Sequence, residues 1–298
     1  MREKGIIVGY FADGPWAHKA LEMLINDPKS EVGFVCVRDD NRDPVLIEMA
    51  NNNDIPNFSL KNINSKESHS KLAKYETDLF VSMSFNQIFK PNTANLSPLG
   101  TINCHAGKLP LYKGRNILTW ALINDEKEFG ITVHYIDEGI DTGDIILQRC
   151  FPINDDDTYK SLLEVAYEEC ANILFDAISH IRVGDQERKT QEGIGFYCSR
   201  RIEGDEQINW DQTSRELFNF IRSICAPGVM ARAFLNNEMI KINSAKLVEG
   251  APCYKGTPGV VVGIDEYSFT IKTLDSILKI TEWESNIKIR LGHRFDLK

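Results

Sequence analysis

The stretch from residue 5 to residue 37 reads GIIVGYFADGPWAHKALEMLINDPKSEVGFVCV. Its first and last seven residues are apolar runs of the kind that form buried strands. Between them, residues 16–25 carry apolar side chains at near-helical spacing and end before an Asp-Pro pair. A strand, a helix and a strand in this order predict two parallel strands joined by a crossover helix, the repeating unit of an α/β sheet.

The same alternation continues well beyond this unit. Further apolar runs predict strands at residues 78–85, 101–105, 130–136 and 144–151. Helical periodicity predicts helices at residues 45–51, 116–124 and 157–181. The polar segment 52–76 gives no clear pattern beyond a helix at its end. We therefore expect an α/β fold, with a Rossmann-like, mostly parallel sheet flanked by helices.

The pattern changes after residue 182. Residues 183–199 are polar and interrupted by glycine, which is typical of a linker. A helix at residues 213–223 is then followed by short β-like runs at residues 231–235, 239–242, 259–262, 268–273 and 276–280. Several short strands at this spacing predict a small barrel or sandwich. We expect a first domain at residues 1–182, a linker at 183–199 and a smaller β-rich domain at 200–298.

Composition excludes several classes of protein. Hydrophobic residues make up 42% of the 298 residues and charged residues 26%, a balance typical of a packed globular chain rather than a disordered one. The 34 Lys and Arg face 43 Asp and Glu, so the net charge is −9. Because proteins that neutralise many phosphates usually carry the opposite sign, this charge disfavours nucleic acid and anionic membranes as partners.

The cysteines and the chain start bear on the compartment. The seven cysteines are scattered and form no CxxC pair, which excludes a zinc knuckle and predicts free thiols. The N-terminal sequence meets charges and glycine too early for a secretory signal, and no apolar run reaches the length of a membrane span. We expect a cytoplasmic protein.

Residues 101–114, TINCHAGKLPLYKG, carry the first candidate for chemistry. In an extended segment Asn103 and His105 project to the same side. In open α/β sheets, ligands bind beyond the carboxyl ends of the strands. An amide that stabilises an oxyanion, next to an imidazole that moves a proton, suits acyl transfer. The alternative is that both side chains only satisfy a turn.

The second candidate is the carboxylate-rich loop at residues 136–144, IDEGIDTGD. It could form a hydrogen-bonded turn, bind a divalent cation or supply a catalytic carboxylate. A calcium loop needs ligands at alternate positions over a longer span, so we predict no metal. Together with Asn103 and His105, a residue such as Asp141 could orient the imidazole. The other histidines lack such a context and are interpreted as surface or packing residues: His18, His69, His134, His180 and His293.

These segments resemble the N10-formyltetrahydrofolate-dependent formyltransferase family. The sequences NCHAGKLPLYKGR and GITVHYIDEGIDTGDII match its Asn-x-His before a Leu-Pro turn and its distant Asp in a D-x-G-x-D-T-G loop. The resemblance continues through VSMSFNQIF at residues 81–89 and covers most of residues 1–180. It implies a catalytic triad of Asn103, His105 and Asp141. It also implies that N10-formyltetrahydrofolate, as co-substrate, donates a formyl group to a primary amine.

The resemblance also implies binding residues. The folate slot would be lined by Phe85, Asn86, Gln87, Gly139 and Ile140. The acceptor would meet Tyr112 and Arg115 beside the glycine turn, where an arginine can hold a pyrophosphate in bidentate fashion. Asp13 and Arg38, which follow the first two strands, could also contact the acceptor.

Within the family, GRNILTWAL and YFADGPW look most similar to the nucleotide-sugar branch. That branch formylates the 4-amino group of a UDP- or dTDP-linked aminodideoxysugar; it implies a role in lipopolysaccharide or surface-glycan biosynthesis, and a homodimer. Residues 200–298 resemble the OB-like tail shared by methionyl-tRNA formyltransferases and the UDP-4-amino-arabinose formyltransferase, so the tail does not separate the two substrates. This region holds 14 basic and 13 acidic residues, without the excess of positive charge that a tRNA would require.

Methionyl-tRNA formyltransferase remains the alternative. Glycinamide-ribonucleotide formyltransferase does not need the second domain, and a formate-releasing hydrolase would act without an amine. An NAD-dependent oxidoreductase is disfavoured because GYFADG, after the first strand, lacks the GxGxxG spacing. A catalytically silent folate- or sugar-binding module would bind ligand without turnover.

Overall fold

The computed structural model describes residues 5–296 of the chain. The chain divides into two compact units, each described separately. Unit 1 contains the chain up to Arg115 together with Phe129–Phe151 and Glu164–Cys198, and unit 2 contains Asn116–Glu128, Pro152–Leu163 and the chain from Ser199 onward. Within the described range, none of the helices combines the length and the apolar character that a bilayer span demands.

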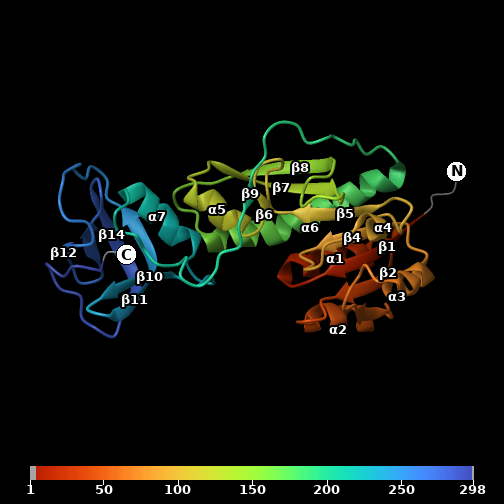
Figure 1. Ribbon diagram of the computed structural model, residues 1–298, viewed down its shortest axis with the longest axis horizontal. Coiled ribbons are helices and arrows are strands. Elements are labelled where there is room, and N and C mark those ends of the chain that lie inside the picture. Colours follow the sequence, from red (N-terminus) through yellow and green to blue (C-terminus); the bar gives the residue numbers. More distant parts are fainter. Residues whose placement is uncertain (1–4, 297–298) are drawn as a thin grey trace. The chain divides into compact units, whose positions relative to one another are not determined.

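Unit 1 is built on a seven-stranded sheet in the order β3-β2-β1-β4-β5-β7-β8 (Figure 1). The strands are β1 (Ile6–Ala12), β2 (Ser30–Val37), β3 (Asn57–Ser59), β4 (Leu79–Met83), β5 (Thr101–His105), β7 (Glu128–Tyr135) and β8 (Ile145–Pro152). The pairs from β3 to β5 are parallel, whereas β5 and β7 are antiparallel. The mostly parallel sheet predicted from the sequence is thus confirmed.

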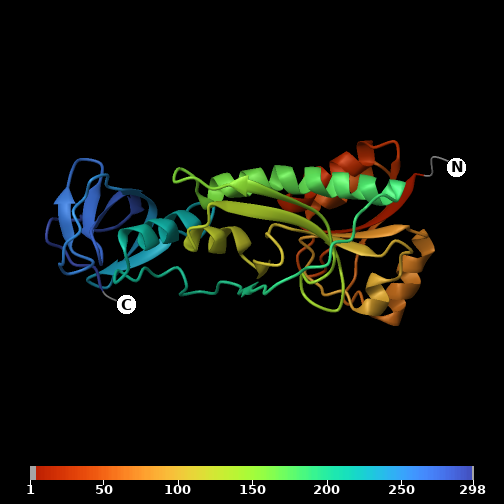
Figure 2. The same ribbon diagram turned by 90° about the horizontal axis from the view of Figure 1, so that it is seen from above.

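Helices cover both faces of this sheet. They are α1 (Pro15–Asn26), α2 (Pro44–Asn52), α3 (Lys66–Leu72), the 3₁₀ turn η1 (Ala73–Tyr75), α4 (Pro91–Ala94) and α6 (Tyr159–Val183). In Figure 2, α1 and α6 lie on one side of the sheet and α3 lies on the other. The predicted helices at residues 16–25, 45–51 and 157–181 correspond to α1, α2 and α6.

Side chains on β1 show how the sheet is held between these layers. Tyr10 points to one face and donates its hydroxyl to the carbonyl of Ala17 in α1, at 2.9 Å. Phe11 points to the other face, where its ring meets Phe34 and Phe80 edge-on at 5.3 and 5.1 Å. Because both faces of the strand are buried, its sequence is a continuous apolar run rather than an alternating one.

The parallel strands β1, β2, β4 and β5 end at Ala12, Val37, Met83 and His105. Carboxyl ends of parallel strands meet at one edge of a sheet, and ligands bind at that edge in α/β proteins. The loops that follow these strands carry most of the residues that the sequence singled out.

A two-stranded parallel sheet was not predicted from the sequence. It pairs β6 (Lys113–Gly114) with β9 (Tyr197–Cys198), matching Lys113 to Tyr197 and Gly114 to Cys198. Strands of two residues are too short to show a period in the sequence, and this pair joins segments far apart in the chain.

We call residues 184–198 the strap, because this segment follows unit 1 closely. Lys189 exchanges backbone hydrogen bonds with Ile145 at the start of β8, at 2.8 and 2.9 Å. Further along, the carbonyl of Phe196 accepts from the amide of Lys113 at 3.0 Å. Figure 1 shows the strap, in green, leaving the end of α6 and reaching β9 beside β6. Most of the segment expected to be a linker is therefore bound to unit 1.

Unit 2 contains a five-stranded antiparallel sheet in the order β10-β11-β14-β13-β12. Its strands are β10 (Ala231–Leu235), β11 (Glu238–Leu247), β12 (Val261–Ile264), β13 (Phe269–Lys272) and β14 (Ile277–Glu284), and its helices are α5 (Ile117–Ile123) and α7 (Ser214–Ser223). Thr213 and Glu216 form a capping box at the start of α7. Trp210, Phe269 and Phe295 lie in a fully buried core, so the second, β-rich domain is confirmed.

Candidate active site

Asn103 and His105 lie on β5, between β4 and β7. The sequence predicted that both side chains face one site. In the structure both are connected to the carboxylate of Asp141, His105 directly and Asn103 through His134. His105 is buried, with 8% of its surface exposed. Its Nδ1 atom lies 3.6 Å from Oδ2 of Asp141. Asn103 reaches the same carboxylate through His134, whose Nε2 atom is 3.3 Å from Asn103 Nδ2 and 3.4 Å from Asp141 Oδ1.

The loop after β5 fixes the orientation of His105. Its Nε2 atom lies 2.7 Å from the carbonyl oxygen of Tyr112. Because a carbonyl can only accept, Nε2 must carry the proton and Nδ1 is the bare nitrogen of the neutral ring. Tyr112 has a left-handed backbone with φ of 55°, an uncommon conformation for a residue other than glycine that is frequent at functional sites.

Gly107 makes room for this hydrogen bond. A Cβ atom at this position would lie 2.4 Å from Nε2 of His105 and 2.5 Å from the carbonyl oxygen of Tyr112. Both distances are far inside van der Waals contact, so a side chain at residue 107 would separate donor and acceptor. Glycine is required here by close approach.

Asp141 is held from several directions. It has a φ of 55°, and its Oδ2 atom accepts a hydrogen bond from the amide of Gly114 in β6 at 2.9 Å. Burial by itself would raise the pKa of this carboxyl group. A hydrogen bond donated by His134 when protonated, the charges of both histidines in that state and the Gly114 amide outweigh burial and lower the pKa of Asp141 to about 2. The carboxyl group is therefore ionised at neutral pH.

His134 is the site residue that the sequence analysis missed, because we assigned it to packing or the surface. It is buried with 2% exposure on β7, and the antiparallel register pairs it with Asn103 on β5. Its Nδ1 atom is 2.8 Å from the carbonyl of Tyr135, so Nδ1 carries the proton and Nε2 is bare in the neutral ring. The alternation of GITVHYI was visible in the sequence, but the pairing partner was not.

The two histidines therefore carry their protons on opposite nitrogens. In the neutral state, Nδ1 of His105 and Nε2 of His134 both turn a bare lone pair toward the ionised carboxylate of Asp141. Burial lowers the pKa of His105, and the charge of Asp141 and the hydrogen bond to Tyr112 only partly offset this effect. With its pKa lowered, His105 is neutral and available as a base at neutral pH, and a proton taken up on Nδ1 would face the carboxylate of Asp141.

The residues predicted to contact the acceptor after β1 and β2 lie together. Arg38 contacts Oδ2 of Asp13 through Nη1 at 2.9 Å and binds both carboxylate oxygens of Asp40 at 3.0 and 2.7 Å. The hydrogen bonds with Asp40 and then Asp13 outweigh burial and raise the pKa of Arg38. This guanidinium is engaged on three sides, so its predicted contact with a ligand would require an exchange of partners.

The predicted folate residues fall into two loops. Phe85 is half-buried against Phe11, at 5.5 Å between ring centroids, whereas Asn86 is exposed and donates to Asp40. Gln87 uses both ends of its amide on the chain, because its Oε1 accepts from the amide of Ile63 and its Nε2 donates to the carbonyl of Leu60.

Gly139 and Ile140 lie on the loop of Asp141. The amide of Gly139 donates to Asp137 at 3.0 Å, and Ile140 is 50% exposed. An exposed aliphatic side chain next to the Asp141 carboxylate is available to cover a flat ring.

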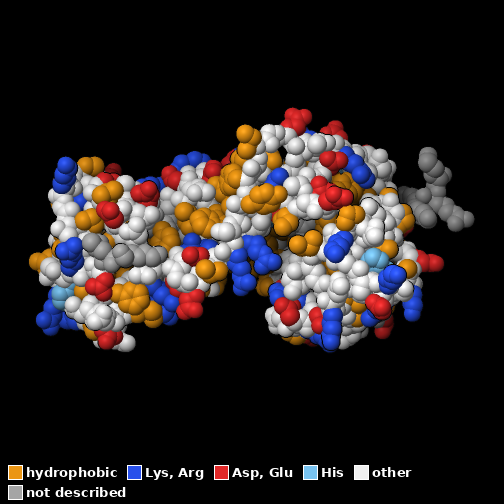
Figure 3. Space-filling model, viewed as in Figure 1, with side chains coloured by type: hydrophobic (Ala, Val, Ile, Leu, Met, Phe, Trp, Pro, Cys, Tyr) orange, Lys and Arg blue, Asp and Glu red, His pale blue; other side chains and the backbone are white. Residues whose placement is uncertain are grey.

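Tyr112 and Arg115 flank the glycine turn differently. The Tyr112 ring is buried and meets Phe196 edge-on at 4.7 Å, so Tyr112 serves the site through its carbonyl. Arg115 is exposed, and its amide donates to the carbonyl of Cys198. Hydrophobic side chains gather at the surface over β6 and β9 (Figure 3), where Phe196 and Tyr197 are 39% and 59% exposed.

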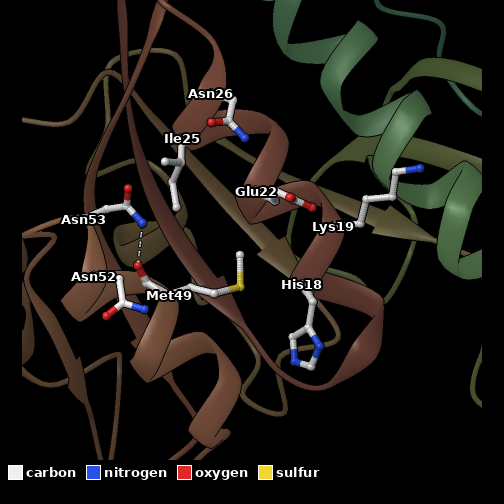
Figure 4. A pocket seen from close by; sticks show the side chains of 8 residues that line it. All are labelled: His18, Lys19, Glu22, Ile25, Asn26, Met49, Asn52 and Asn53. Atoms are coloured by element: carbon white, nitrogen blue, oxygen red, sulfur yellow. Dashed lines mark hydrogen bonds between the residues drawn. The ribbon is translucent and has the colours of Figure 1, made fainter.

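A separate groove of about 600 Å³ lies between α1 and α2 (Figure 4). It is lined by His18, Lys19, Glu22, Ile25, Asn26, Met49, Asn52 and Asn53. None of the predicted site residues is among them. Within residues 5–296, no group of three or more His, Cys, Asp or Glu side chains is arranged to hold a metal ion.

Comparison with known families decides which chemistry this arrangement belongs to. The profile described as "Formyl transferase" matches residues 5–178, and "Formyl transferase, C-terminal domain" matches residues 202–293. The chain belongs to the formyl transferase family. The enzyme is thus a formyltransferase, and the resemblance found in the sequence is confirmed.

Named relatives of this formyltransferase differ in their acceptors. The methionyl-tRNA formyltransferase of Pelotomaculum thermopropionicum is 32% identical over 241 residues, which cover 80% of this chain and 76% of that protein. The N-formyltransferase of Helicobacter canadensis, solved with folinic acid and dTDP-3-aminofucose, is 25% identical with a TM-score of 0.68 and covers 94% of this chain and 100% of its own. WlaRD, a sugar 3N-formyl transferase, shares the fold at 24% identity and a TM-score of 0.71. The match covers 95% of this chain and 99% of WlaRD.

Proposed function

We propose that this formyltransferase moves a formyl group from N10-formyltetrahydrofolate to the amino group of a UDP- or dTDP-linked aminodeoxysugar. The observation that carries the chemistry is the cluster of Asn103, His105, His134 and Asp141 at the carboxyl edge of the sheet. It combines an amide donor for an oxyanion with a buried proton acceptor, which are the two functions that amine formylation requires.

The reaction balances in atoms and protons. The acceptor amine attacks the formyl carbon and forms a C–N bond, while the carbonyl oxygen becomes an oxyanion. When the tetrahedral intermediate collapses, the bond between the formyl carbon and folate N10 breaks, and N10 takes a proton. The proton that the amine loses therefore replaces the one that N10 gains, and no metal or redox partner is needed.

Each residue of the cluster has a defined task in this scheme. Asn103 directs one Nδ2 hydrogen toward His134, and the second can donate to the oxyanion. His105 accepts the amine proton on Nδ1, because Nε2 is occupied by the carbonyl of Tyr112. The carboxylate of Asp141 then stabilises the imidazolium at 3.6 Å and can pass a proton toward N10.

Charge and chain coverage support a nucleotide sugar as acceptor. The net charge of −9, with 14 basic and 13 acidic residues in residues 200–298, offers little attraction to a tRNA. The N-formyltransferase solved with dTDP-3-aminofucose is matched over 100% of its own length and covers 94% of this chain. The sequence favoured a 4-amino group, whereas that relative and WlaRD are named for 3-amino chemistry, so both positions belong in the test. The homodimer and the role in surface-glycan synthesis belong to this proposal.

Methionyl-tRNA is the second candidate acceptor. The observation in its favour is the 32% identity with a methionyl-tRNA formyltransferase over 80% of this chain. A tRNA enzyme should bind more weakly at higher salt, because phosphate contacts release counterions. A sugar nucleotide with two phosphates should show a much weaker salt dependence.

The test is a turnover assay with N10-formyltetrahydrofolate and a panel of UDP- and dTDP-linked 3-amino and 4-amino sugars, run beside methionyl-tRNA. Tetrahydrofolate release and the mass of the acceptor are measured together. We expect a formyl mass increase on one sugar, with loss of activity in His105→Ala and not in the exposed control His180→Ala. Formylation of methionyl-tRNA alone would refute the sugar acceptor, and folate consumption without any acceptor would indicate a hydrolase.

A further inference from the structure

A residue of the strap holds the second half of the loop that carries Asp141. Gln191 directs its Nε2 atom at two carbonyl oxygens, that of Asp141 at 3.0 Å and that of Gly143 at 2.8 Å. One amide group thus uses its two hydrogens to bridge the residues on either side of Thr142. Near the other end of the loop, Asp137 accepts hydrogen bonds from the amide of Gly139 and the hydroxyl of Thr142.

The bridge connects Asp141 to a fixed point. A Cβ atom at Gly143 would lie 1.9 Å from the carbonyl oxygen of Tyr135, so Gly143 packs directly against the backbone at the end of β7. The amide of Tyr135 also donates to the carbonyl of Asp144 at 2.9 Å. Gln191 therefore ties the backbone of Asp141 to a part of the loop that is packed tightly against the sheet.

The strap itself is anchored on both sides of Gln191. Before it, Lys189 pairs with Ile145 through two backbone hydrogen bonds. After it, the carbonyl of Phe196 accepts from Lys113, in the segment that supplies the Tyr112 carbonyl to His105. The strap thus contacts the loop that carries Asp141 and the segment that follows Tyr112. Gln191 lies between its two backbone anchors.

The amide oxygen of Gln191, unlike its amide nitrogen, makes no hydrogen bond to the loop. Its Oε1 atom is buried and accepts no hydrogen bond within residues 5–296. A buried polar atom without a partner costs free energy, and native proteins retain few of them. The orientation of the amide is thus set by its two donated hydrogen bonds to the loop.

We propose that Gln191 is a positioning residue for formyl transfer, which sets the carboxylate of Asp141 at its distance from His105. It acts through the backbone of the loop that carries Asp141. The inference rests on the proposed roles of His105 and Asp141 and adds a third residue from a segment that the sequence predicted to be a linker.

The test compares Gln191→Met and Gln191→Glu with Gln186→Met in the full-length protein. Methionine keeps the length of the side chain but donates nothing, and glutamate can only accept, so both variants lose the bridge. Gln186 is the matched control, because it lies on the same strap and also has a buried Oε1 atom without a partner among the described residues 5–296. Thermal unfolding of each variant reports whether the fold is intact.

The first readout is an NMR titration of the His105 ring, which needs no acceptor. The charge of Asp141 raises the pKa of His105 against the larger effect of burial. A carboxylate that moves away raises it less, so the pKa of His105 should fall in Gln191→Met and stay unchanged in Gln186→Met. The added negative charge of Gln191→Glu opposes this fall, so that variant is judged by its kinetics alone.

The second readout is steady-state kinetics on whichever acceptor the wild type formylates. We expect kcat to fall by about tenfold in both Gln191 variants with little change in KM, as for a misplaced catalytic group. A wild-type titration of His105 in folded Gln191→Met overturns the inference, as does an equal effect of Gln186→Met. If the titration shifts but the wild type formylates no acceptor, the positioning role stands and the proposed function fails.

Discussion

Asp141 in unit 1 and Asp125 in unit 2 share two features. Both have a φ of 55°, and the pKa of each is lowered to about 2 although burial alone would raise it. Their partners are of different kinds. Asp141 faces two imidazoles, whereas Asp125 accepts hydrogen bonds from Arg215 and Asn219.

The difference between the partners distinguishes the proposed catalytic cluster of unit 1 from a structural cluster in unit 2. An imidazole gains or loses a proton near neutral pH, so the cluster of Asp141 can store a proton during a reaction. A guanidinium stays protonated, so the cluster of Asp125 only holds its parts together. A low aspartate pKa therefore does not by itself identify a catalytic residue, and the chemistry of its partners has to be considered as well.

The unit 2 cluster continues into the interior through Arg222, whose side chain is 5% exposed. Its Nε atom donates to Asn219, and its Nη1 atom donates to the carbonyls of Asn154 and Asp157. These bonds join α7 to the segment before α6 within unit 2. Its Nε and Nη1 atoms both donate within the fold, which makes Arg222 a structural reference for the proposed catalytic cluster.

The largest expected effect is the loss of the imidazole at the catalytic cluster. His105→Ala removes the base, and we expect kcat/KM to fall by about 10³-fold while the protein stays folded. Thermal unfolding and the turnover assay measure the two quantities on the same preparation. Retention of more than a tenth of the activity would remove His105 from the mechanism.

A smaller loss is expected from disturbing the same imidazole without replacing it. Gly107→Ala places a Cβ atom 2.4 Å from Nε2 of His105, and displacing a catalytic group by about 1 Å can cost about 10²-fold in rate. Gly263→Ala in unit 2 is the control, because its Cβ atom would meet Thr270 at an ordinary 3.4 Å. If both variants lose the same activity, crowding at Gly107 is not the cause.

The structural cluster should respond in the opposite way. Arg222→Met leaves the carbonyls of Asn154 and Asp157 and the amide oxygen of Asn219 without their donor, and we expect the free energy of unfolding to drop by about 3 kcal/mol. Activity per folded molecule should remain within a factor of about two. Denaturant unfolding at 25 °C measures the first quantity, and a kcat reduced below the wild-type range would place this cluster in the reaction.

How far the sequence reveals each cluster depends on the separation of its parts. Asn103 and His105 are two positions apart on one strand, so the period of a strand predicts that they face the same side. The D-x-G-x-D-T-G motif of its loop made Asp141 predictable from the sequence. His134 was not, because its place depends on the register between β5 and β7, which no local pattern specifies.

The same limit explains the other residues that the sequence did not reveal. The acceptor contact of Tyr112 stays a prediction, and the hydrogen bond between its backbone carbonyl and His105 was not foreseen from the sequence. Gln191 lies in a polar, glycine-containing segment that looks like a linker, and only the chain path shows that it reaches the loop of Asp141. Composition and periodicity do not indicate long-range hydrogen bonds. They do indicate the strands of the parallel sheet, which are continuous apolar runs.

The smallest expected effect is the pH dependence that distinguishes the two clusters. Burial lowers the pKa of His105 in the folded protein below its ordinary value of about 6.5. The unfolded chain therefore binds a proton first as pH falls, so the contribution of His105 to stability is complete above pH 6.5 and is lost as pH falls through the lower folded pKa. The base form needed for catalysis disappears over the same interval.

Asp125 and Asp141 lose their stabilising effect only at more acidic pH, between the ordinary value near 3.8 and about 2. The acid response below pH 6.5 is thus assigned to His105, since the guanidinium of the other cluster stays protonated. We expect the acid limb of kcat/KM to lie below pH 6.5 in the wild type and to be unchanged in Arg222→Met. An acid limb that moves with Arg222 would mean that the guanidinium cluster senses the reaction, and the distinction between the two aspartates would then fail.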